Sequence, residues 1–521
     1  MTWRFYLLLA LLSLATLSFV ASLQPSPGYM DADYYFSGGL QLVKGRGFTE
    51  PYLWNYLDNP TGLPHPSHAY WMPLASLLAA AGAFIFGPSS WLAARIGFLL
   101  LGALIPPITA ALAWSFTSRR DLSLISGFLA VFSVFYLVFL PVTDTFGLYM
   151  ILGGLFFIIV NRKSSGLNPL MLGIIAGLMH LARADGIIWL ATAFIVVLFI
   201  FPKPSNNRFI YIISFLLLVT AGYLLVMGPW FIRNLTVFGS PLAPGSSRSL
   251  WLKSYDQLFT YPSSQISFSS WWQTGLAAIS RVRVWALGLN LSNMLSVQGE
   301  IFLFPFIMLG AWYFRKDRRI QLAGLMWLLT IFIMTVIFPF AGARGGFFHS
   351  GASVQMIWWV LAPVGLDRVI IWGNHHRGWM IAQSRKIFGV GFVIIAMILS
   401  TLLIYERVLG GGGHSKWGQE NEAYSQMTSM MVKQGMTGNS VVIVANPPGF
   451  YLSSGNPAIA VPDGDINTLL SVATRYGGKY VILEEGATPA GLLSVYNNPV
   501  GNVGLKFLGE IMGAHIYAIQ P

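Results

Sequence analysis

The chain contains no cysteine, and only 10% of its 521 residues are charged. The absence of cysteine excludes disulfide bonds, thiolate metal sites and cysteine nucleophiles. Soluble chains carry about a quarter charged residues, so the low charge content excludes a soluble enzyme and a disordered scaffold. The formal net charge of +12 does not indicate nucleic-acid binding, because the basic residues lie in short loops between apolar runs and not on one face.

Hydrophobic residues make up 55% of the chain. Apolar runs of roughly 17–25 residues, long enough to cross a bilayer, recur from the N-terminus to residue 405. The sequence therefore predicts a polytopic α-helical membrane protein. The first run, 5–23, follows Arg4 and is expected to be a signal anchor or a signal peptide with its N-terminus in the cytoplasm.

Basic clusters between the runs predict the direction of each span, because Lys and Arg favour cytoplasmic loops. These clusters are Arg119/Arg120, Arg162/Lys163, Lys203/Arg208, Arg315/Lys316/Arg318/Arg319 and Arg377/Arg385/Lys386. About eleven spans result, near 5–23, 90–113, 122–141, 145–160, 168–182, 187–201, 209–228, 300–314, 320–340, 351–371 and 387–405. Segment 72–86 is left over and is expected to be an interfacial or re-entrant helix on the outer face, because a full crossing would put the later basic clusters outside.

The same threading gathers most acidic residues of the membrane part at the outer surface, and only Asp121, Asp317 and Asp367 fall on the cytoplasmic side. The outer acids are Asp31, Asp33, Glu50, Asp58, Asp144, Asp185, Asp256 and Glu300. No acid falls at the middle of a predicted span, where a transporter or a proton pump holds its ionisable groups. The chemistry of this protein is therefore expected at the outer boundary between membrane and water.

The chain beyond the last span has the composition of a soluble domain. Residues 408–423 are predicted to be a Gly-rich linker, and 424–521 a small extracytoplasmic α/β domain. Short β-rich runs at 441–445 and 479–485 predict strands. A helical pattern over 466–477 has Asp465 as its expected N-cap.

The first outer loop, 24–71, carries two acids directly after the first span. Asp31 or Asp33 can accept a proton from an attacking hydroxyl, and the structural alternative is that one of them caps the following helix. Further along, His65 and His68 are weak candidates for metal ligands, because a third ligand at recognisable spacing is missing. Near them Trp71 has the character of an interfacial anchor.

Three further outer sites carry acids or out-of-place basic residues. Asp144 lies between two predicted spans, where an N-cap is the default role. Arg183 can hold a lipid phosphate bidentately, or form a structural pair with Asp185. Arg344 and His349 flank glycines whose backbone can approach an anion, although this segment can also be a flexible turn. Acids beside phosphate-binding groups suit a transferase that uses a lipid-phosphate donor.

These residues resemble the GT-C fold glycosyltransferases, including protein O-mannosyltransferases and bacterial lipid A aminoarabinose transferases. The motifs that carry the resemblance are D-x-D-Y-Y at 31–35, His65-Pro with Tyr70-Trp71-Met-Pro73, Ala93-Ala-Arg95, Thr143-Asp144-Thr-Phe, Leu181-Ala-Arg183-Ala-Asp185-Gly, Pro229-Trp-Phe-Ile-Arg233-Asn and Phe347-Phe-His349-Ser. Their order and common outer placement cover nearly the whole membrane part.

The resemblance implies transfer of a sugar from a polyprenyl- or dolichyl-phosphate donor, usually with inversion, on the outer face. Asp31 would be the general base, with Asp33 the second choice. Arg183 falls where the aminoarabinose transferases have a phosphate-binding lysine. Tyr34 and Trp71 would line the sugar pocket, although each taken singly is also suited to interfacial anchoring.

We therefore expect an integral-membrane glycosyltransferase, specifically a hexosyltransferase, in domains 1–407 and 424–521 joined by 408–423. Its expected location is the plasma (inner) membrane, and its partners are a polyprenyl-phosphate-linked sugar, a lipid, glycan or protein acceptor and the bilayer, with no nucleic acid. No cofactor is certain, and a divalent metal is left open. The alternatives are a transporter or lipid flippase, or a non-catalytic anchor that presents the C-terminal domain.

Overall fold

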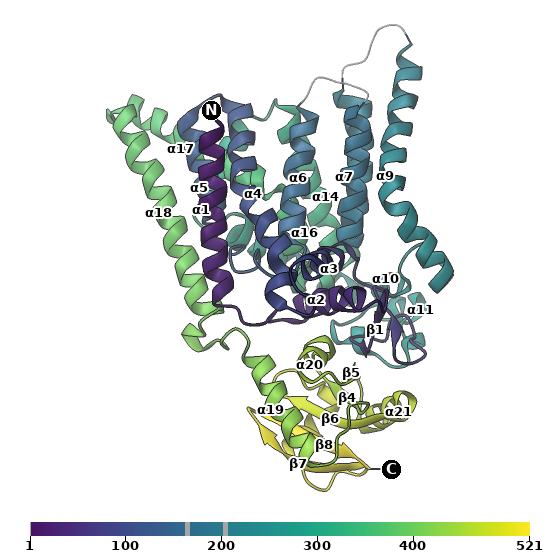
Figure 1. Ribbon diagram of the computed structural model, residues 1–521. Coiled ribbons are helices and arrows are strands. Elements are labelled where there is room, and N and C mark those ends of the chain that lie inside the picture. Colours follow the sequence, from purple (N-terminus) through teal and green to yellow (C-terminus); the bar gives the residue numbers. More distant parts are fainter. Residues whose placement is uncertain (1, 162–166, 202–206, 521) are drawn as a thin grey trace.

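The computed structural model describes residues 2–161, 167–201 and 207–520, so the predicted basic positions Arg162, Lys163 and Lys203 lie outside the described residues. A bundle of helices occupies one part of the molecule, and a small α/β domain lies at one end of it (Figure 1). Among the described residues, six helices or helix series are long and apolar enough to cross a membrane: α1 (Trp3–Ser22), α4 (Trp91–Thr117), α9 (Arg208–Phe238), Arg318–Ile337 beginning with α14 (Arg318–Phe332), Pro339–Arg377 ending with α17 (Gln355–Arg377), and α18 (Ile381–Arg407).

Shorter helices complete the bundle. They are α5 (Arg120–Val131), α6 (Phe146–Val160), α7 (Leu167–Ala182), α8 (Ile187–Ile195), α12 (Leu276–Asn293) and α13 (Phe304–Tyr313). The membrane-protein class and the helical architecture are confirmed. The count of about eleven spans stays a prediction, because most of these helices are shorter than a full crossing and the 18-residue α12 lies outside the predicted spans.

Glycines let the helices of the bundle approach closely. A Cβ atom on Gly173 of α7 would lie 2.0 Å from the Val219 carbonyl oxygen of α9, and one on Gly222 would lie 2.3 Å from the Leu170 carbonyl oxygen. Small residues at such contacts are the usual means by which apolar helices associate in lipid.

Helix α18 begins at the end of the bundle away from the α/β domain (Figure 1), and an ion-pair cluster joins its start to α5 and α17. Asp367 accepts bonds from Arg119 at 2.7 Å, Arg385 at 2.7 Å and Arg368 at 3.1 Å. These pairs join the start of α5, α17 and the start of α18. The predicted placement of the basic clusters on the cytoplasmic side stays a prediction.

Two helices lie across the opposite end of the bundle, α2 (Met30–Val43) and α3 (Leu74–Phe86) (Figure 1). Helix α3 is the segment expected to be interfacial or re-entrant. Between α2 and α3, the strands β1 (Thr49–Glu50) and β3 (His65–Pro66) pair antiparallel.

The α/β domain is built on a six-stranded sheet in the order β2-β5-β4-β6-β8-β7. Its strands are β4 (Val441–Val444), β5 (Ala458–Ala460), β6 (Gly478–Glu484), β7 (Leu505–Ile511), β8 (Ala514–Ile519) and, from the first outer loop, β2 (Tyr52–Leu53). Strands β2, β5, β4 and β6 run parallel to one another. Strand β8 pairs antiparallel with β6 on one side and with β7 on the other. The division at residues 407 and 424 stays a prediction, because β2 joins the sheet from the other side of that division.

Three main helices accompany this sheet: α19 (Gln419–Lys433), α20 (Pro447–Ser454) and α21 (Ile466–Tyr476). The expected N-cap of α21 is confirmed, since the Asp465 side chain accepts a hydrogen bond from the Thr468 N–H at 2.9 Å. Helix α20 faces α2, and this contact brings the domain against the membrane part.

Candidate functional site

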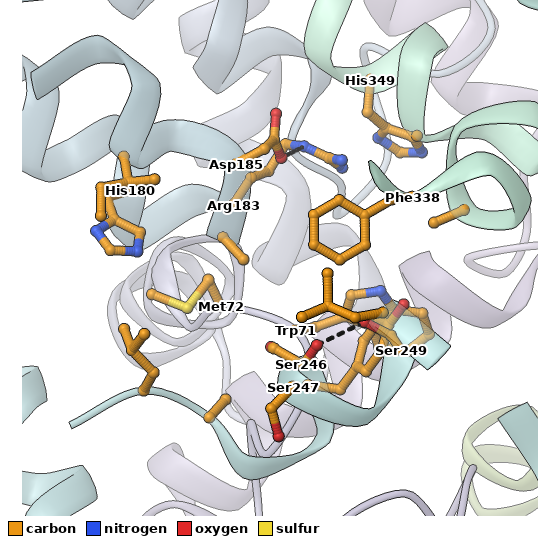
Figure 2. A pocket seen from close by; sticks show the side chains of 18 of the residues that line it. Trp71, Met72, His180, Arg183, Asp185, Ser246, Ser247, Ser249, Phe338 and His349 are labelled. Atoms are coloured by element: carbon orange, nitrogen blue, oxygen red, sulfur yellow. Dashed lines mark hydrogen bonds and ion pairs between the residues drawn. The ribbon is translucent and has the colours of Figure 1, made fainter. Parts of the chain in front are cut away.

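A cavity of about 640 Å³ lies between the end of the bundle and the first outer loop. Figure 2 shows Arg183, His349 and Trp71 at its wall, together with serines of the segment that follows α9. Asp31, Asp185 and Arg344 also line it. The cavity thus brings together side chains that the sequence places in separate loops.

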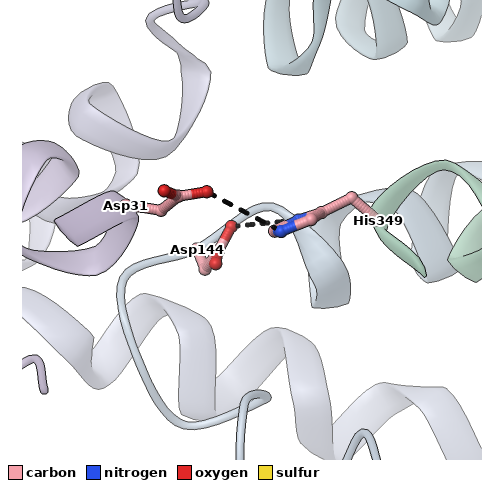
Figure 3. A group of neighbouring side chains, drawn as sticks. All are labelled: Asp31, Asp144 and His349. Carbon is pink, nitrogen blue, oxygen red and sulfur yellow. Dashed lines mark ion pairs between the residues drawn. The ribbon is translucent and has the colours of Figure 1, made fainter. Parts of the chain in front are cut away.

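Asp31, Asp144 and His349 converge beside this cavity (Figure 3). Asp31 lies in the first turn of α2, Asp144 in the turn before α6, and His349 on α16 (Phe347–Gly351). The His349 Nε2 atom is 3.7 Å from Asp31 Oδ2, and Nδ1 is 3.5 Å from Asp144 Oδ1. These separations exceed normal hydrogen-bond lengths, so the three groups face one another without direct bonds.

The two partners of Asp31 are fixed by their own neighbours. The Tyr29 hydroxyl donates to Asp144 Oδ2 at 2.6 Å, and the Thr145 N–H donates to Asp144 Oδ1 at 2.5 Å. The Phe146 ring stacks on His349 with centroids 3.9 Å apart.

The acids considered as N-caps from the sequence do not have this role in the structure. The N-cap residue of α2 is Tyr29, and that of α6 is Thr145. Neither helix has a side-chain capping bond, so Asp31, Asp33 and Asp144 do not cap these helices.

Burial dominates the electrostatics of the paired acids. It raises the pKa of Asp31, the charge of Asp144 raises it further, and the charge of Arg183 lowers it. Burial also raises the pKa of Asp144, against the hydrogen bonds from Tyr29 and Thr145 that lower it. A carboxyl whose pKa lies above its usual range is better suited to proton abstraction near neutral pH.

Arg183 combines the two roles considered for it from the sequence. Its Nε donates to Asp185 Oδ1 at 3.0 Å, and Asp185 in turn accepts from the Ser350 hydroxyl at 2.6 Å. The guanidinium carbon lies 5.8 Å from the centre of the Tyr149 ring. The structural pair is present, and Arg183 still lines the cavity.

Arg344 lies across the cavity in an irregular part of the chain. Its φ and ψ are −94° and 21°, and the following Gly345 has a φ of 120°, a value that strongly favours glycine. The guanidinium stacks 4.8 Å from the centre of the Tyr255 ring. An arginine in this position can contact a phosphate in the cavity.

The other sequence candidates occupy different surroundings. Asp33 is 6% exposed and accepts a hydrogen bond from Asn446 of the α/β domain at 2.9 Å. Tyr34 is buried, and its hydroxyl accepts from the His68 N–H at 2.7 Å. Neither Asp33 nor Tyr34 is among the described residues that line the cavity.

The two histidines considered as metal ligands are hydrogen-bonded within the first outer loop and to α3. The His65 Nε2 atom is 2.6 Å from Asp58 Oδ2. The ring nitrogens of His68 lie 2.8 Å from the Ser67 hydroxyl and 3.1 Å from the Ser76 hydroxyl. The group with metal-ligand spacing is instead Asp31, Asp144 and His349, whose ligand atoms lie within 4.8 Å of one another.

Aromatic residues form much of the remaining wall. Trp71 stacks on Trp54 with ring centroids 4.0 Å apart and planes at 7°, and both rings line the cavity with Tyr35 and Tyr70. Tyr255 was missed by sequence reasoning. The only signal for it is the aromatic content of the loop after α9, which is also typical of interfacial anchoring.

Comparison with solved structures identifies the fold. An oligosaccharyltransferase from Archaeoglobus fulgidus, tethered to an acceptor peptide containing an NVT sequon, matches over 93% of this chain and 69% of its own, with a TM-score of 0.55 and 14% identity. ArnT from Cupriavidus metallidurans, bound to undecaprenyl phosphate, matches over 99% of this chain and 98% of its own, with a TM-score of 0.52 and 13% identity.

A third structure, the A. fulgidus oligosaccharyltransferase in complex with Zn and sulfate, matches over 92% of this chain and 67% of its own, at a TM-score of 0.55 and 14% identity. No protein-family model and no curated protein sequence matches the chain. All three structures are GT-C glycosyltransferases, so the predicted GT-C fold is confirmed.

Proposed function

We propose that this protein is an integral-membrane glycosyltransferase that moves a sugar from a polyprenyl-phosphate donor to an acceptor hydroxyl. The observation that carries the proposal is the cavity of about 640 Å³, where Asp31 and Arg183 share one wall. The GT-C fold supports it, because solved neighbours with this fold are an oligosaccharyltransferase with an acceptor peptide and ArnT with undecaprenyl phosphate.

The proposed reaction is a single displacement. Asp31 accepts the proton of the acceptor hydroxyl while the hydroxyl oxygen forms a bond to the anomeric carbon of the sugar. The bond between that carbon and the phosphate oxygen breaks, and the phosphate leaves with the electron pair. Attack from the face opposite the leaving group inverts the anomeric configuration.

The leaving phosphate needs charge stabilisation and not a proton. Arg183 and Arg344 line the same cavity and supply guanidinium groups that match phosphate oxygens. The bond to Asp185 uses the Arg183 Nε atom and neither of the two terminal nitrogens of the guanidinium. Trp71 supplies an aromatic face for the sugar.

Asp31, Asp144 and His349 would also fit a divalent metal ion. Two carboxylates and an imidazole are a ligand set for Zn²⁺ or Mn²⁺, and their separations of 3.5 and 3.7 Å show no mutual hydrogen bonds to be broken. An ion there would supply Lewis-acid stabilisation of developing negative charge. The protein's own contribution is to hold the two acids and the imidazole through Tyr29, Thr145 and Phe146.

The orientation in the membrane, the donor and the acceptor are proposed as the sequence analysis expects them. Helix α2, which carries Asp31 of the cavity, and the α/β domain lie at the end of the bundle opposite the start of α18, where Asp367 pairs with Arg385 (Figure 1). We propose that this end faces the extracytoplasmic side of the plasma (inner) membrane. The donor is proposed to carry a hexose, and the acceptor to be a lipid, a glycan or a protein.

Donor consumption tests the function. Purified protein in nanodiscs is mixed with undecaprenyl-phosphate hexoses labelled in the sugar, with membrane extract as the source of acceptors. We expect time-dependent loss of label from the donor, and loss of this activity after dialysis against EDTA if the metal site is used. A protein that neither consumes these donors nor binds undecaprenyl phosphate would contradict the proposal and favour a transporter, a flippase or an anchor.

A further inference from the structure

Helix α2 lies between the cavity and the α/β domain, and its two acids face opposite ways. Asp31 and Asp33 are two residues apart on the helix, which turns about 100° per residue. Asp31 lines the cavity, whereas Asp33 accepts a hydrogen bond from Asn446 of the α/β domain at 2.9 Å. A displacement of Asp33 therefore moves Asp31 with the same turn of helix.

The α/β domain and the segment before it contact α2 along its length. Just before α2, the Trp417 indole N–H donates to the Ser26 carbonyl oxygen at 2.9 Å. Near the end of α2, the Gln41 amide donates to the Tyr451 hydroxyl at 3.0 Å. Of these contacts, the bond from Asn446 to Asp33 in the first turn is the nearest to Asp31 along the chain.

A glycine lies at the contact between Asn446 and Asp33. A Cβ atom on Gly449 would lie 2.8 Å from Asp33 Oδ2 and 2.5 Å from Asn446 Nδ2. Real Cβ atoms essentially never approach a neighbour this closely, so a larger residue at position 449 would displace these two side chains.

The orientation of the Asn446 amide is determined by its partners. Its Oδ1 accepts from the Gly449 N–H at 3.1 Å, which caps α20. Its Nδ2 therefore faces two carboxyls and donates to Asp33 Oδ2 and to Glu420 Oε1, both at 2.9 Å. One amide thus supplies the donors for two buried acids, and removing it leaves both without that bond.

The shared amide separates two acids. Asn446 Nδ2 donates to both Asp33 and Glu420, so without it the two carboxyls would face each other with no donor between them, and like charges repel.

We propose that the α/β domain fixes the position of Asp31 through the hydrogen bond between Asn446 and Asp33, which makes Asn446 a positioning residue for the transfer reaction. The inference rests on the proposed function and gives the domain a role in it. It also assigns Asp33 to positioning and leaves Asp31 as the base.

The test compares Asn446→Ala with a matched variant, Asn456→Ala. Asn456 is also a buried amide of the α/β domain, but it donates to the Thr437 and Ser440 carbonyl oxygens within that domain. Full-length proteins in nanodiscs are assayed with a labelled undecaprenyl-phosphate hexose that the wild type consumes. Because small misplacements of a catalytic group are costly, we expect kcat of Asn446→Ala to fall by about 10- to 100-fold with KM for the donor changed by less than about twofold. Asn456→Ala should keep the wild-type kcat.

A rescue variant separates positioning from a general loss of packing. The triple variant Asp33→Asn, Asn446→Asp, Glu420→Gln exchanges amides and carboxyls. The new side chains at 33 and 420 are amides that can both donate to the new carboxylate at 446. Asn446→Asp alone places three acids together and should lower kcat. We expect the triple variant to recover most of the wild-type kcat.

Hydrogen exchange of the α2 amides is a second measurement that needs no donor. Faster exchange in residues 29–36 for Asn446→Ala, but not for Asn456→Ala, supports the proposal. Equal kcat and equal α2 exchange in these two variants would overturn it. If Asp31→Asn also abolishes turnover in that case, the proposed function stands without the positioning role. If Asp31→Asn keeps full turnover, the assignment of the base fails, and the positioning proposal fails with it.

Discussion

The acids at the two ends of the helical bundle have different charged partners. At the end away from the α/β domain, Asp367 is 2% exposed and has three arginines within 3.1 Å. At the other end, Asp31 and Asp144 share one histidine at 3.7 and 3.5 Å, and the nearby Arg183 is paired with Asp185. A fully paired acid indicates a structural role, whereas acids without direct cationic partners beside a cavity indicate chemistry.

The difference also separates stability from activity. Breaking a buried ion pair by removing one partner leaves an uncompensated charge. Removing Asp367 takes this partner from three arginines, of which Arg119 keeps its pair with Asp121. Removing Arg183 from the cavity wall breaks one ion pair, with Asp185, and removes the proposed contact to substrate. The variants below test this separation.

Asp367→Ala should have the largest effect, and on stability alone. Removing one partner of a buried ion pair costs about 3–5 kcal/mol, so the thermal unfolding midpoint in detergent should fall clearly. Turnover per folded molecule should stay near that of the wild type, because the cluster lies at the opposite end from the cavity. Loss of turnover without loss of stability would contradict the comparison.

Arg183→Met should show the reverse pattern. Loss of a group that stabilises the leaving phosphate lowers kcat by about 100-fold. The unfolding midpoint should fall less than in Asp367→Ala, because only one ion pair is lost and Asp185 keeps the hydrogen bond from Ser350. Arg183→Lys is the control, because it keeps the charge but loses the bidentate geometry, and it should lie between wild type and Met. Equal activity of all three proteins would exclude a phosphate contact by Arg183.

The sequence predicted the fold and the shared placement of several site residues. Hydrophobic runs and basic loops put Asp31, Arg183 and Arg344 at one end, and the structure brings them to one cavity. The motifs along the membrane part predicted the GT-C fold, which the structural comparison confirms.

Contacts between residues far apart in the chain were not predicted from the sequence. The first outer loop donates β2 to the sheet, pairing Tyr52 with Ala458, and the bond between Asp33 and Asn446 spans 413 positions. Helical periodicity indicates that Asp31 and Asp33 face opposite ways. It does not indicate which of them faces the cavity, because that depends on where the α/β domain docks.

The pH dependence of kcat/KM tests the assignment of Asp31 as the base. Asp31 must be deprotonated to act as a base, and burial and the charge of Asp144 raise its pKa. Activity should therefore rise with pH by about 10-fold per unit on an acid limb that lies above the usual carboxyl pKa of about 4. Because the charge of Arg183 lowers the pKa of Asp31, Arg183→Met should move this limb to higher pH. A limb that stays in place, or moves to lower pH, would contradict the assignment of the base.

Turnover of Asp31→Asn beside Asp33→Asn tests the central claim most directly. An asparagine at position 31 cannot accept a proton, whereas one at position 33 keeps an oxygen that accepts the bond from Asn446. With a labelled undecaprenyl-phosphate hexose, the account predicts that Asp31→Asn loses turnover by about 100-fold or more while Asp33→Asn keeps most of it. Loss of turnover in Asp33→Asn with full activity in Asp31→Asn would contradict it.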